Sequence, residues 1–334
     1  MSDRLASSPE AAVRSVVHVT RPRRTGRRRR IVRGGLAAVV VLVTIGLVVG
    51  LQYRSQITSY LTHWKGSPTN TRPLVAFPPG DQQLLHMAVA GDTGDSGSRL
   101  DRTAAAIAEW NSTDPFDFLL LLGDNVYPNG DPAKLDATVF TPFAATLDSG
   151  TRLLAILGNH DVKDGNGPAQ MAALGMEGLR WAHEDDDVLL VGLDSNRPDD
   201  PEQLAWLEET LARSDAKWKI VALHHPPYSA GYQGSSAEVR AVFQPVFERH
   251  GVQLVLSGHD HDYQRSTPIN GVTYVVSGAG SGTRRTGEED FTAVSFSWHH
   301  FLDVNVFADR LVVRAVNQDL RVADEFSLTP EPSG

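Results

Sequence analysis

The chain has 334 residues, of which 41% are hydrophobic and 21% charged, and it contains no cysteine. This length and composition are typical of one large globular domain or two small ones. The lack of cysteine excludes a disulfide framework, thiolate metal sites and a cysteine nucleophile, so any metal site must use His, Asp, Glu, Asn or Tyr.

The net charge of −9 is distributed unevenly along the chain. Residues 1–33 hold ten arginines against Asp3 and Glu10, a net charge of +8, so the remaining residues carry −17. An acidic body lacks the clustered Lys and Arg that a phosphate backbone requires, which argues against nucleic acid as a partner. Residues 1–33 also lack apolar periodicity, and we expect them to form a basic, disordered cytoplasmic tail.

An uncharged apolar run at residues 34–51 follows this tail. Its length falls within the roughly 17–25 residues that a helix needs to span a bilayer. Because arginines flank its N-terminal side, the positive-inside rule predicts a cytoplasmic N-terminus and an extracytoplasmic remainder. We expect an uncleaved signal anchor in the cell membrane, since the leader is long and no small-x-small cleavage site follows the run. A cleaved signal peptide and a buried helix of a soluble domain are the alternatives.

Residues 52–81 have a mixed composition with several prolines and no clear period, which is typical of a linker. A globular domain is expected from residue 82 to residue 328, followed by a short tail at 329–334. With about 250 residues, this domain is large enough to bury a core and fold alone.

Apolar strands alternate with helices through the first part of this domain. Strands are expected at 84–90, 116–122, 153–157, 188–193, 218–223 and 252–257, and helices at 99–110, 201–213 and 237–250. After Gly271 the chain is mostly β, with strands expected at 272–276, 301–307 and 311–316. Alternating strands and helices followed by a β-rich tail indicate an α/β or α+β sandwich.

Polar residues that can bind metal stand just past the ends of five of these strands. They are Asp92, then Asp124 and Tyr127, then Asn159 and His160, then His224, and finally His259 and His261. In open α/β sheets the carboxyl ends of the strands converge on one crevice, where ligands bind. Each residue alone can be explained as a turn residue or as a satisfied buried histidine. Together they favour a metal site, and their number suits two ions that share a carboxylate.

Five motifs in this order resemble those of the calcineurin-like metallophosphoesterase superfamily, and within it those of the purple, tartrate-resistant acid phosphatase branch. They are Gly91-Asp92-Thr93-Gly94, Gly123-Asp124-Asn125-Val126-Tyr127, Gly158-Asn159-His160-Asp161, Val221-Ala222-Leu223-His224 and Gly258-His259-Asp260-His261. Most of the superfamily has a histidine two residues after the first aspartate, where this chain has Gly94. That replacement, together with Tyr127, is typical of the purple branch. The resemblance implies a four-layer α/β/β/α metallophosphoesterase sandwich.

The resemblance also implies a binuclear metal centre with ligands from all five motifs. The first ion would bind Asp92, Tyr127, His261 and the bridging Asp124, and the second would bind Asp124, Asn159, His224 and His259. A phenol with an ordinary pKa near 10 binds metal well as a phenolate, which a trivalent ion can impose, so Fe³⁺ is expected at the first site. Fe²⁺, Zn²⁺ or Mn²⁺ is expected at the second.

The implied activity is the hydrolysis of small phosphate monoesters by in-line attack of a metal-bound hydroxide on phosphorus. His160 is the candidate that stabilises the transition state or protonates the leaving alcohol. His225 is a second candidate, or else a loop histidine beside two prolines. Animal members of the branch often have a further histidine at the position of Val162, so the substrate contacts here can differ. A phosphodiesterase, nucleotidase or pyrophosphatase on the same centre and a non-catalytic surface binding module are the alternatives.

Overall fold

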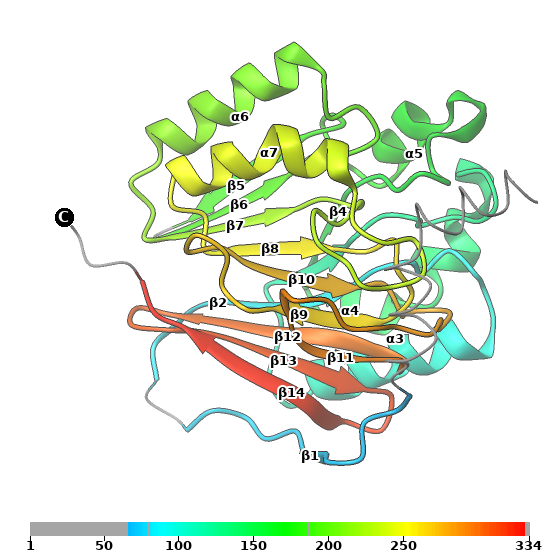
Figure 1. The fold of residues 1–334 in the computed structure, drawn as a ribbon. Helices are drawn as coiled ribbons and strands as arrows, with labels where there is room; N and C mark the ends of the chain where they lie inside the picture. Colours follow the sequence, from blue (N-terminus) through cyan, green and yellow to red (C-terminus); the bar gives the residue numbers. More distant parts are fainter. Residues whose placement is uncertain (1–65, 79–80, 186, 331–334) are drawn as a thin grey trace, which may run out of the picture. The chain divides into compact units, whose positions relative to one another are not determined.

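The computed structural model describes residues 66–78, 81–185 and 187–330 (Figure 1). Within these ranges no helix is long and apolar enough to cross a membrane. The predicted membrane anchor at 34–51 and the basic tail at 1–33 lie outside the described residues, as does the part of the predicted linker before residue 66.

Two seven-stranded sheets form the centre of the described structure. In the first sheet, three strands are parallel neighbours: β2 (Gln83–Ala90), β3 (Phe118–Leu121) and β4 (Arg152–Ala155). Beyond β2 this sheet continues with four antiparallel strands, β12 (His300–Phe307), β13 (Leu311–Asn317), β14 (Arg321–Leu328) and β1 (Arg72–Pro73).

In the second sheet, four strands are parallel neighbours: β6 (Val188–Gly192), β7 (Trp218–Ala222), β8 (Leu254–Ser257) and β10 (Thr273–Ser277). Antiparallel strands extend it on both sides, with β5 (Trp181–Asp185) next to β6, and with β9 (Tyr263–Ser266) and then β11 (Thr292–Phe296) beyond β10. Both sheets therefore contribute loops that follow the carboxyl ends of parallel strands.

Helices cover the outer face of each sheet. The outer face of the second sheet packs against α6 (Pro201–Arg213) and α7 (Ala237–Arg249) (Figure 1). The outer face of the first packs against α3 (Ser98–Asn111), with α4 (Ala144–Leu147) beside it. The remaining helical segments are α5 (Gly167–Ala173), the 3₁₀ turns Pro132–Lys134 and Lys163–Gly165, and the π turn Asp136–Phe140.

The core between the sheets follows from the alternation of side chains along each strand. In β2, Met87 and Val89 pack into the core between the two sheets, whereas Ala88 and Ala90 pack in the cluster that contains the apolar face of α3. Because both faces of β2 are buried, its sequence is a nearly continuous apolar run rather than an alternating one. The expected α/β sandwich with two sheets is confirmed, with helices on both outer faces.

Residues 72–75, which fall within the predicted linker, pack along the first sheet. Arg72 and Pro73 pair with β14, and the buried Leu74 donates its backbone N–H to the carbonyl of Leu320. The guanidinium of the buried Arg314 donates a hydrogen bond of 2.6 Å to the carbonyl of Val75. These contacts with the first sheet lie ahead of residue 82 in the sequence.

Burial of His300 at the start of β12 should make the stability of the fold depend on pH. Its Nε2 lies 2.9 Å from Ser277 Oγ and its Nδ1 lies 2.8 Å from the Trp298 carbonyl. Burial lowers the pKa of the ring from 6.5 to about 4. Between these two values the unfolded chain binds a proton that the folded protein does not, so the free energy of unfolding should fall by about 1.4 kcal/mol for each pH unit of acidification.

Replacing His300 with glutamine should remove this contribution to the pH dependence of the free energy of unfolding. Urea unfolding at several pH values between 4.5 and 6.5 measures the slope for both proteins. Equal slopes would show that His300 does not cause the dependence.

Candidate metal centre

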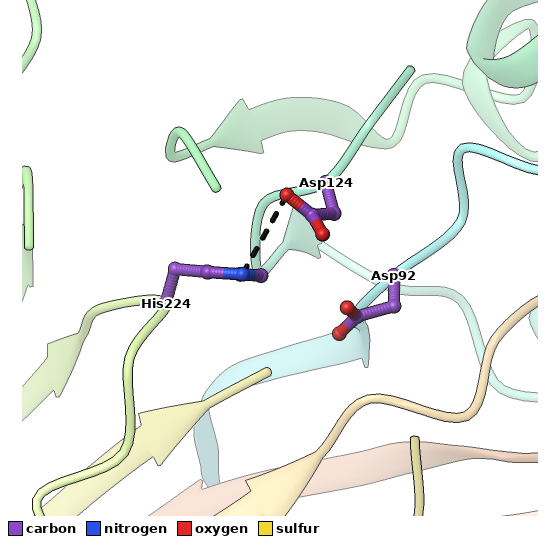
Figure 2. Close-up of side chains that lie close together, drawn as sticks. All are labelled: Asp92, Asp124 and His224. Atoms are coloured by element: carbon purple, nitrogen blue, oxygen red, sulfur yellow. Dashed lines mark ion pairs between the residues drawn. The ribbon is translucent and has the colours of Figure 1, made fainter. Parts of the chain in front are cut away.

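The predicted ligands come together where strands of both sheets end. In the first sheet, Asp92 follows β2 and Asp124 follows β3, whereas in the second His224 follows β7 and His259 follows β8. Figure 2 shows Asp92, Asp124 and His224 close together, and each offers a ligand atom within 4.8 Å of the other two. All three side chains are buried.

A carboxylate, a phenol and an imidazole form the first compact group of ligand atoms. The Tyr127 hydroxyl lies 3.1 Å from Asp92 Oδ1 and 3.1 Å from His261 Nε2. His261 Nε2 lies 3.3 Å from the same Asp92 oxygen. Neighbouring ligand atoms bonded at about 2.1 Å to one octahedral ion stand about 3 Å apart. The spacing of this group therefore fits a single cation.

The second group surrounds Nε2 of His224. This atom lies 3.2 Å from Asn159 Oδ1, 3.2 Å from His259 Nδ1 and 3.6 Å from Asp124 Oδ1. The other ring nitrogen of His224 donates to the Leu122 carbonyl over 2.9 Å, which leaves the Nε2 lone pair for a ligand when the ring is neutral. Nitrogen and oxygen lone pairs that face each other in a buried site need a proton or a cation between them. A second cation fits this donor set, and Asp124 lies close enough to both groups to bridge them.

The pKa shifts show that the buried carboxylates attract positive charge. Burial lowers the pKa of His224, but the charges of Asp124 and Asp92 outweigh it, and the net shift is upward. Burial, followed by the charges of the same two carboxylates, raises the pKa of Tyr127. A phenolate at Tyr127 therefore requires a strongly charged cation at its oxygen.

The pKa of His259 shifts in the opposite direction, downward. Burial, followed by the charges of His224 and His225, lowers the pKa of His259 to about 2. The ring is therefore neutral at any physiological pH, which is the form in which imidazole binds metal.

Three of the predicted ligands are held in an uncommon backbone conformation. The φ angles are 55° at Asp92, 51° at Asp124 and 72° at His259, all in the left-handed region. For residues other than glycine this conformation costs about 1–3 kcal/mol and tends to persist at functional sites.

Two glycines allow the loops to approach the carboxylates closely. A Cβ at Gly158 would lie 2.1 Å from Asp124 Oδ1, and one at Gly278 would lie 2.6 Å from Asp92 Oδ2. Gly158 belongs to one of the five motifs, but sequence reasoning did not identify Gly278. Its only sequence signal is the glycine-rich stretch that follows β10.

Asp161 has a supporting role at the site that its place in the sequence did not predict. Its buried carboxylate accepts hydrogen bonds from the backbone N–H groups of Gly158 (2.8 Å), Asn125 (3.1 Å) and Val126 (3.1 Å). It therefore ties the loop that carries Asp124 to the loop that carries Asn159.

Asp260 lies between the two histidines in sequence, but it turns away from their ligand atoms. Its buried carboxylate accepts hydrogen bonds from the hydroxyl of Ser229 and from the backbone N–H groups of Gln233 (2.7 Å) and Gly234 (3.2 Å). Its contacts are structural, and they hold the loop 229–234 beside the site.

A pocket of about 460 Å³ opens over both groups of ligand atoms. His160 is among its lining residues, and its side chain is 30% exposed. Its Nδ1 lies 2.8 Å from the Pro128 carbonyl, whereas its Nε2 lies 4.0 Å from Asp124 Oδ2. One ring nitrogen is therefore anchored to the backbone while the other is near the centre.

His225 lies behind the ligand histidines and is not among the residues that line this pocket. Its Nδ1 is 2.9 Å from Ser195 Oγ, and its ring centroid is 4.7 Å from that of His259. Burial, followed by the charge of His224, lowers the pKa of His225 to about 3, so the ring is neutral.

Comparison with known proteins places this site within a family. The family model for the calcineurin-like phosphoesterases matches residues 85–263, which include all five motifs. Tartrate-resistant acid phosphatase type 5 of Oryctolagus cuniculus is 28% identical over 254 residues, which cover 64% of this chain and 78% of that protein. Purple acid phosphatase 17 of Arabidopsis thaliana is 27% identical over 228 residues, covering 58% and 67%.

Solved structures share the fold. GAP50, described as the anchor in the inner membrane complex of Plasmodium, superposes with a TM-score of 0.68 at 19% identity, covering 75% of this chain and 90% of that one. A purple acid phosphatase from seeds of yellow lupin (Lupinus luteus) superposes with a TM-score of 0.65 at 17% identity, covering 75% and 55%. The chain belongs to the calcineurin-like phosphoesterase family, in its purple acid phosphatase-like branch, and is a hydrolase of phosphoric ester bonds.

Proposed function

We propose that this protein is a membrane-anchored phosphatase that hydrolyses phosphate monoesters on a centre of Fe³⁺ and a divalent ion. One observation carries the proposal: a phenol-containing group of ligand atoms and an imidazole-rich group lie side by side with Asp124 within reach of both. Donors of this kind suit two ions of different charge, because a phenolate favours a trivalent ion and neutral nitrogen ligands favour a divalent one.

The seven proposed ligands divide between the ions according to the two groups. Asp92, Tyr127 and His261 would hold Fe³⁺, whereas Asn159, His224 and His259 would hold Fe²⁺, Zn²⁺ or Mn²⁺, and Asp124 would bridge them. When bound, such a pair supplies positive charge that neutralises phosphoryl oxygens and makes a water molecule more acidic.

His160 is the residue that we assign to proton transfer. Nδ1 of His160 lies 2.8 Å from the Pro128 carbonyl and 2.9 Å from Lys163 Nζ, so Nε2, the nitrogen nearer the centre, is the ring atom that can donate to a substrate. That donor can protonate the leaving oxygen as the P–O bond breaks, or hydrogen-bond a phosphoryl oxygen in the transition state. For His225 we propose an assisting role through the ring of His259, which it contacts.

The membrane anchor is proposed from residues 34–51 and the arginines before them. With the catalytic domain outside the cell, a protease added to intact cells should remove that domain, and the remaining N-terminal fragment should stay with the membranes. Release of the full activity in soluble form, with no membrane-bound fragment, would contradict the anchor.

The choice of substrate is tested by comparing a phosphate monoester with a phosphodiester at pH 5 and pH 7.5. The monoesterase proposal predicts faster hydrolysis of the monoester and more activity at pH 5, since Fe³⁺ acidifies water strongly. Faster hydrolysis of the diester would favour a phosphodiesterase on the same centre. Purified protein with no iron, no visible colour and no hydrolysis of either ester would favour a surface binding module.

A further inference from the structure

Gln170, on α5, is fully buried, although its side chain is an amide that needs hydrogen-bond partners. Its Nε2 donates to Asp161 Oδ1 over 3.0 Å and to the Gly130 carbonyl over 3.2 Å. Its Oε1 accepts a hydrogen bond of 3.1 Å from Asn125 Nδ2. The amide of this one helical residue therefore contacts two separate loops at once.

The two loops that Gln170 joins hold four of the residues assigned to the proposed centre. They are Asp124 and Tyr127 in loop 123–130, and Asn159 and His160 in loop 158–161. Asp124 would bridge the two ions and Asn159 would bind the divalent one. The position of one loop against the other therefore decides whether both side chains can reach the same ion.

Backbone hydrogen bonds fix the first part of loop 123–130 independently of Gln170. The N–H of Gly94 donates to the Asp124 carbonyl over 2.9 Å, and the N–H of Tyr127 donates to the Gly94 carbonyl over 3.1 Å. These bonds attach the loop to the turn that follows β2. Asp124 and Tyr127 should therefore keep their positions when Gln170 is replaced.

Loop 158–161, in contrast, is placed through Asp161, whose carboxylate accepts from backbone N–H groups of both loops. Gln170 donates to one oxygen of this carboxylate. It also holds the Asn125 amide, whose Nδ2 lies 3.2 Å from the other oxygen. Without Gln170, a buried carboxylate and a buried amide would each lose a partner, which favours their rotation toward other groups. The distance between the two loops would then change.

A second path leads from Gln170 to the ring of His160. The Gly130 carbonyl accepts from Gln170 Nε2. Two residues earlier in the same loop, the Pro128 carbonyl lies 2.8 Å from His160 Nδ1. The Gln170 amide thus supports both the backbone of loop 158–161 and the carbonyl against which the His160 ring lies.

We propose that Gln170 is a positioning residue that sets the distance between the bridging Asp124 and loop 158–161. Its side-chain partners are neither proposed metal ligands nor lining residues of the pocket, so it acts only through the loops that it joins. This role rests on the proposed binuclear centre. It predicts that loss of the amide weakens binding of the divalent ion, which needs Asn159, more than that of Fe³⁺, none of whose ligands lies in loop 158–161.

Gln170→Leu tests this role, because leucine fills most of the same volume but has neither hydrogen-bonding end. Its affinity for Zn²⁺ should be lower by about 10-fold to 100-fold, the usual loss when a residue behind a metal ligand is removed. The measurement is a Zn²⁺ titration of the full-length protein, already holding one Fe³⁺ per chain, against a competing chelator. The visible band should remain, because Tyr127 keeps its hydrogen bond with Gly94.

Gln253→Leu is the matched control, since it removes another buried amide that joins two segments. Gln253 Oε1 accepts from the N–H of Lys219 and its Nε2 donates to the carbonyl of Lys217, each over 2.8 Å. Gln253 precedes β8, at the opposite end of that strand from the proposed ligands. Its replacement should lower thermal stability and leave the Zn²⁺ affinity at the wild-type value.

Gln170→Asn keeps an amide but shortens its reach by one methylene group, so its Zn²⁺ affinity should show a smaller loss, and it serves if Gln170→Leu does not fold. Wild-type Zn²⁺ affinity in the folded Gln170 variants, or an equal loss in Gln253→Leu, would overturn the positioning role and leave the proposed centre intact. Wild-type protein that binds no Zn²⁺ beside its iron would overturn the proposed centre and the positioning role together.

Discussion

Asp124→Ala should abolish phosphatase activity and leave the purified protein with at most one bound metal ion per chain. Asp124 is the carboxylate that lies close to both groups of ligand atoms, with Asp92 on one side and His224 on the other. Without it, neither ion keeps its full set of ligands, and kcat/KM for an aryl phosphate should fall by more than about 10³-fold, since the metals carry most of the charge stabilisation.

Metal analysis by mass spectrometry and an aryl phosphate assay measure both consequences of this change. Asp215→Ala, at an exposed position just after α6, is the matched control and should keep both ions and full activity. A thermal unfolding curve confirms that the variant is folded. Two ions in folded Asp124→Ala protein would exclude a bridging role for this carboxylate.

His160→Ala should have a different result, in which the rate falls and the metal remains. His160 contributes no ligand atom to either compact group, but its ring lines the pocket and its Nε2 lies near Asp124. Loss of a proton donor to the leaving group should lower kcat by about 10²–10⁴-fold. Iron content and visible colour should be those of the wild-type protein.

Substrates with different leaving groups distinguish proton transfer from a structural effect of His160. A nitrophenolate leaves without protonation, whereas an alkoxide does not, so the loss in His160→Ala should be much larger for an alkyl phosphate than for nitrophenyl phosphate. Equal losses for both substrates would assign His160 to phosphoryl binding or to structure instead of leaving-group protonation.

The fold was predictable where local chemistry and burial agree. The bounds of α6 match the prediction because Asp200 caps the helix, accepting from the N–H groups of Glu202 and Gln203, and Pro201 takes the first helical position. The apolar strands of both parallel regions were also recognised, to within two residues at each end, since burial on both faces produces continuous apolar runs.

Two of the strands that the sequence did not predict, β5 and β9, have polar sequences. β5 is an edge strand with the sequence WAHED, and its exposed positions give it no apolar pattern. In β9 the polar Gln264 and Ser266 are buried. Gln264 accepts a hydrogen bond from the backbone N–H of Ala230, in the loop 229–234, and Ser266 accepts one from the backbone N–H of Tyr274 in the neighbouring strand β10. Such contacts depend on the completed fold, so local pattern cannot reveal them.

At the site too, local sequence predicts some features, whereas contacts between distant loops determine others. The positions of the proposed ligands could be predicted because each follows a recognisable strand, and parallel strands end on one side. The closeness of Gly278 to Asp92 and the contacts of the Gln170 amide with loop 123–130 could not, because segments far apart in sequence create them. Gln170 in particular lies in a short helix whose sequence gives no sign of the loop that it contacts.

The visible absorption spectrum of iron-loaded Tyr127→Phe protein tests the central claim most directly, namely that a Tyr127 phenolate binds Fe³⁺ in a binuclear centre. The phenol oxygen lies 3.1 Å from both Asp92 Oδ1 and His261 Nε2, so it is the atom expected to give the charge-transfer colour. We predict that the wild-type protein and His160→Ala are coloured, and that Tyr127→Phe contains iron but lacks the visible band. A Tyr127→Phe protein that stays purple would contradict the assignment.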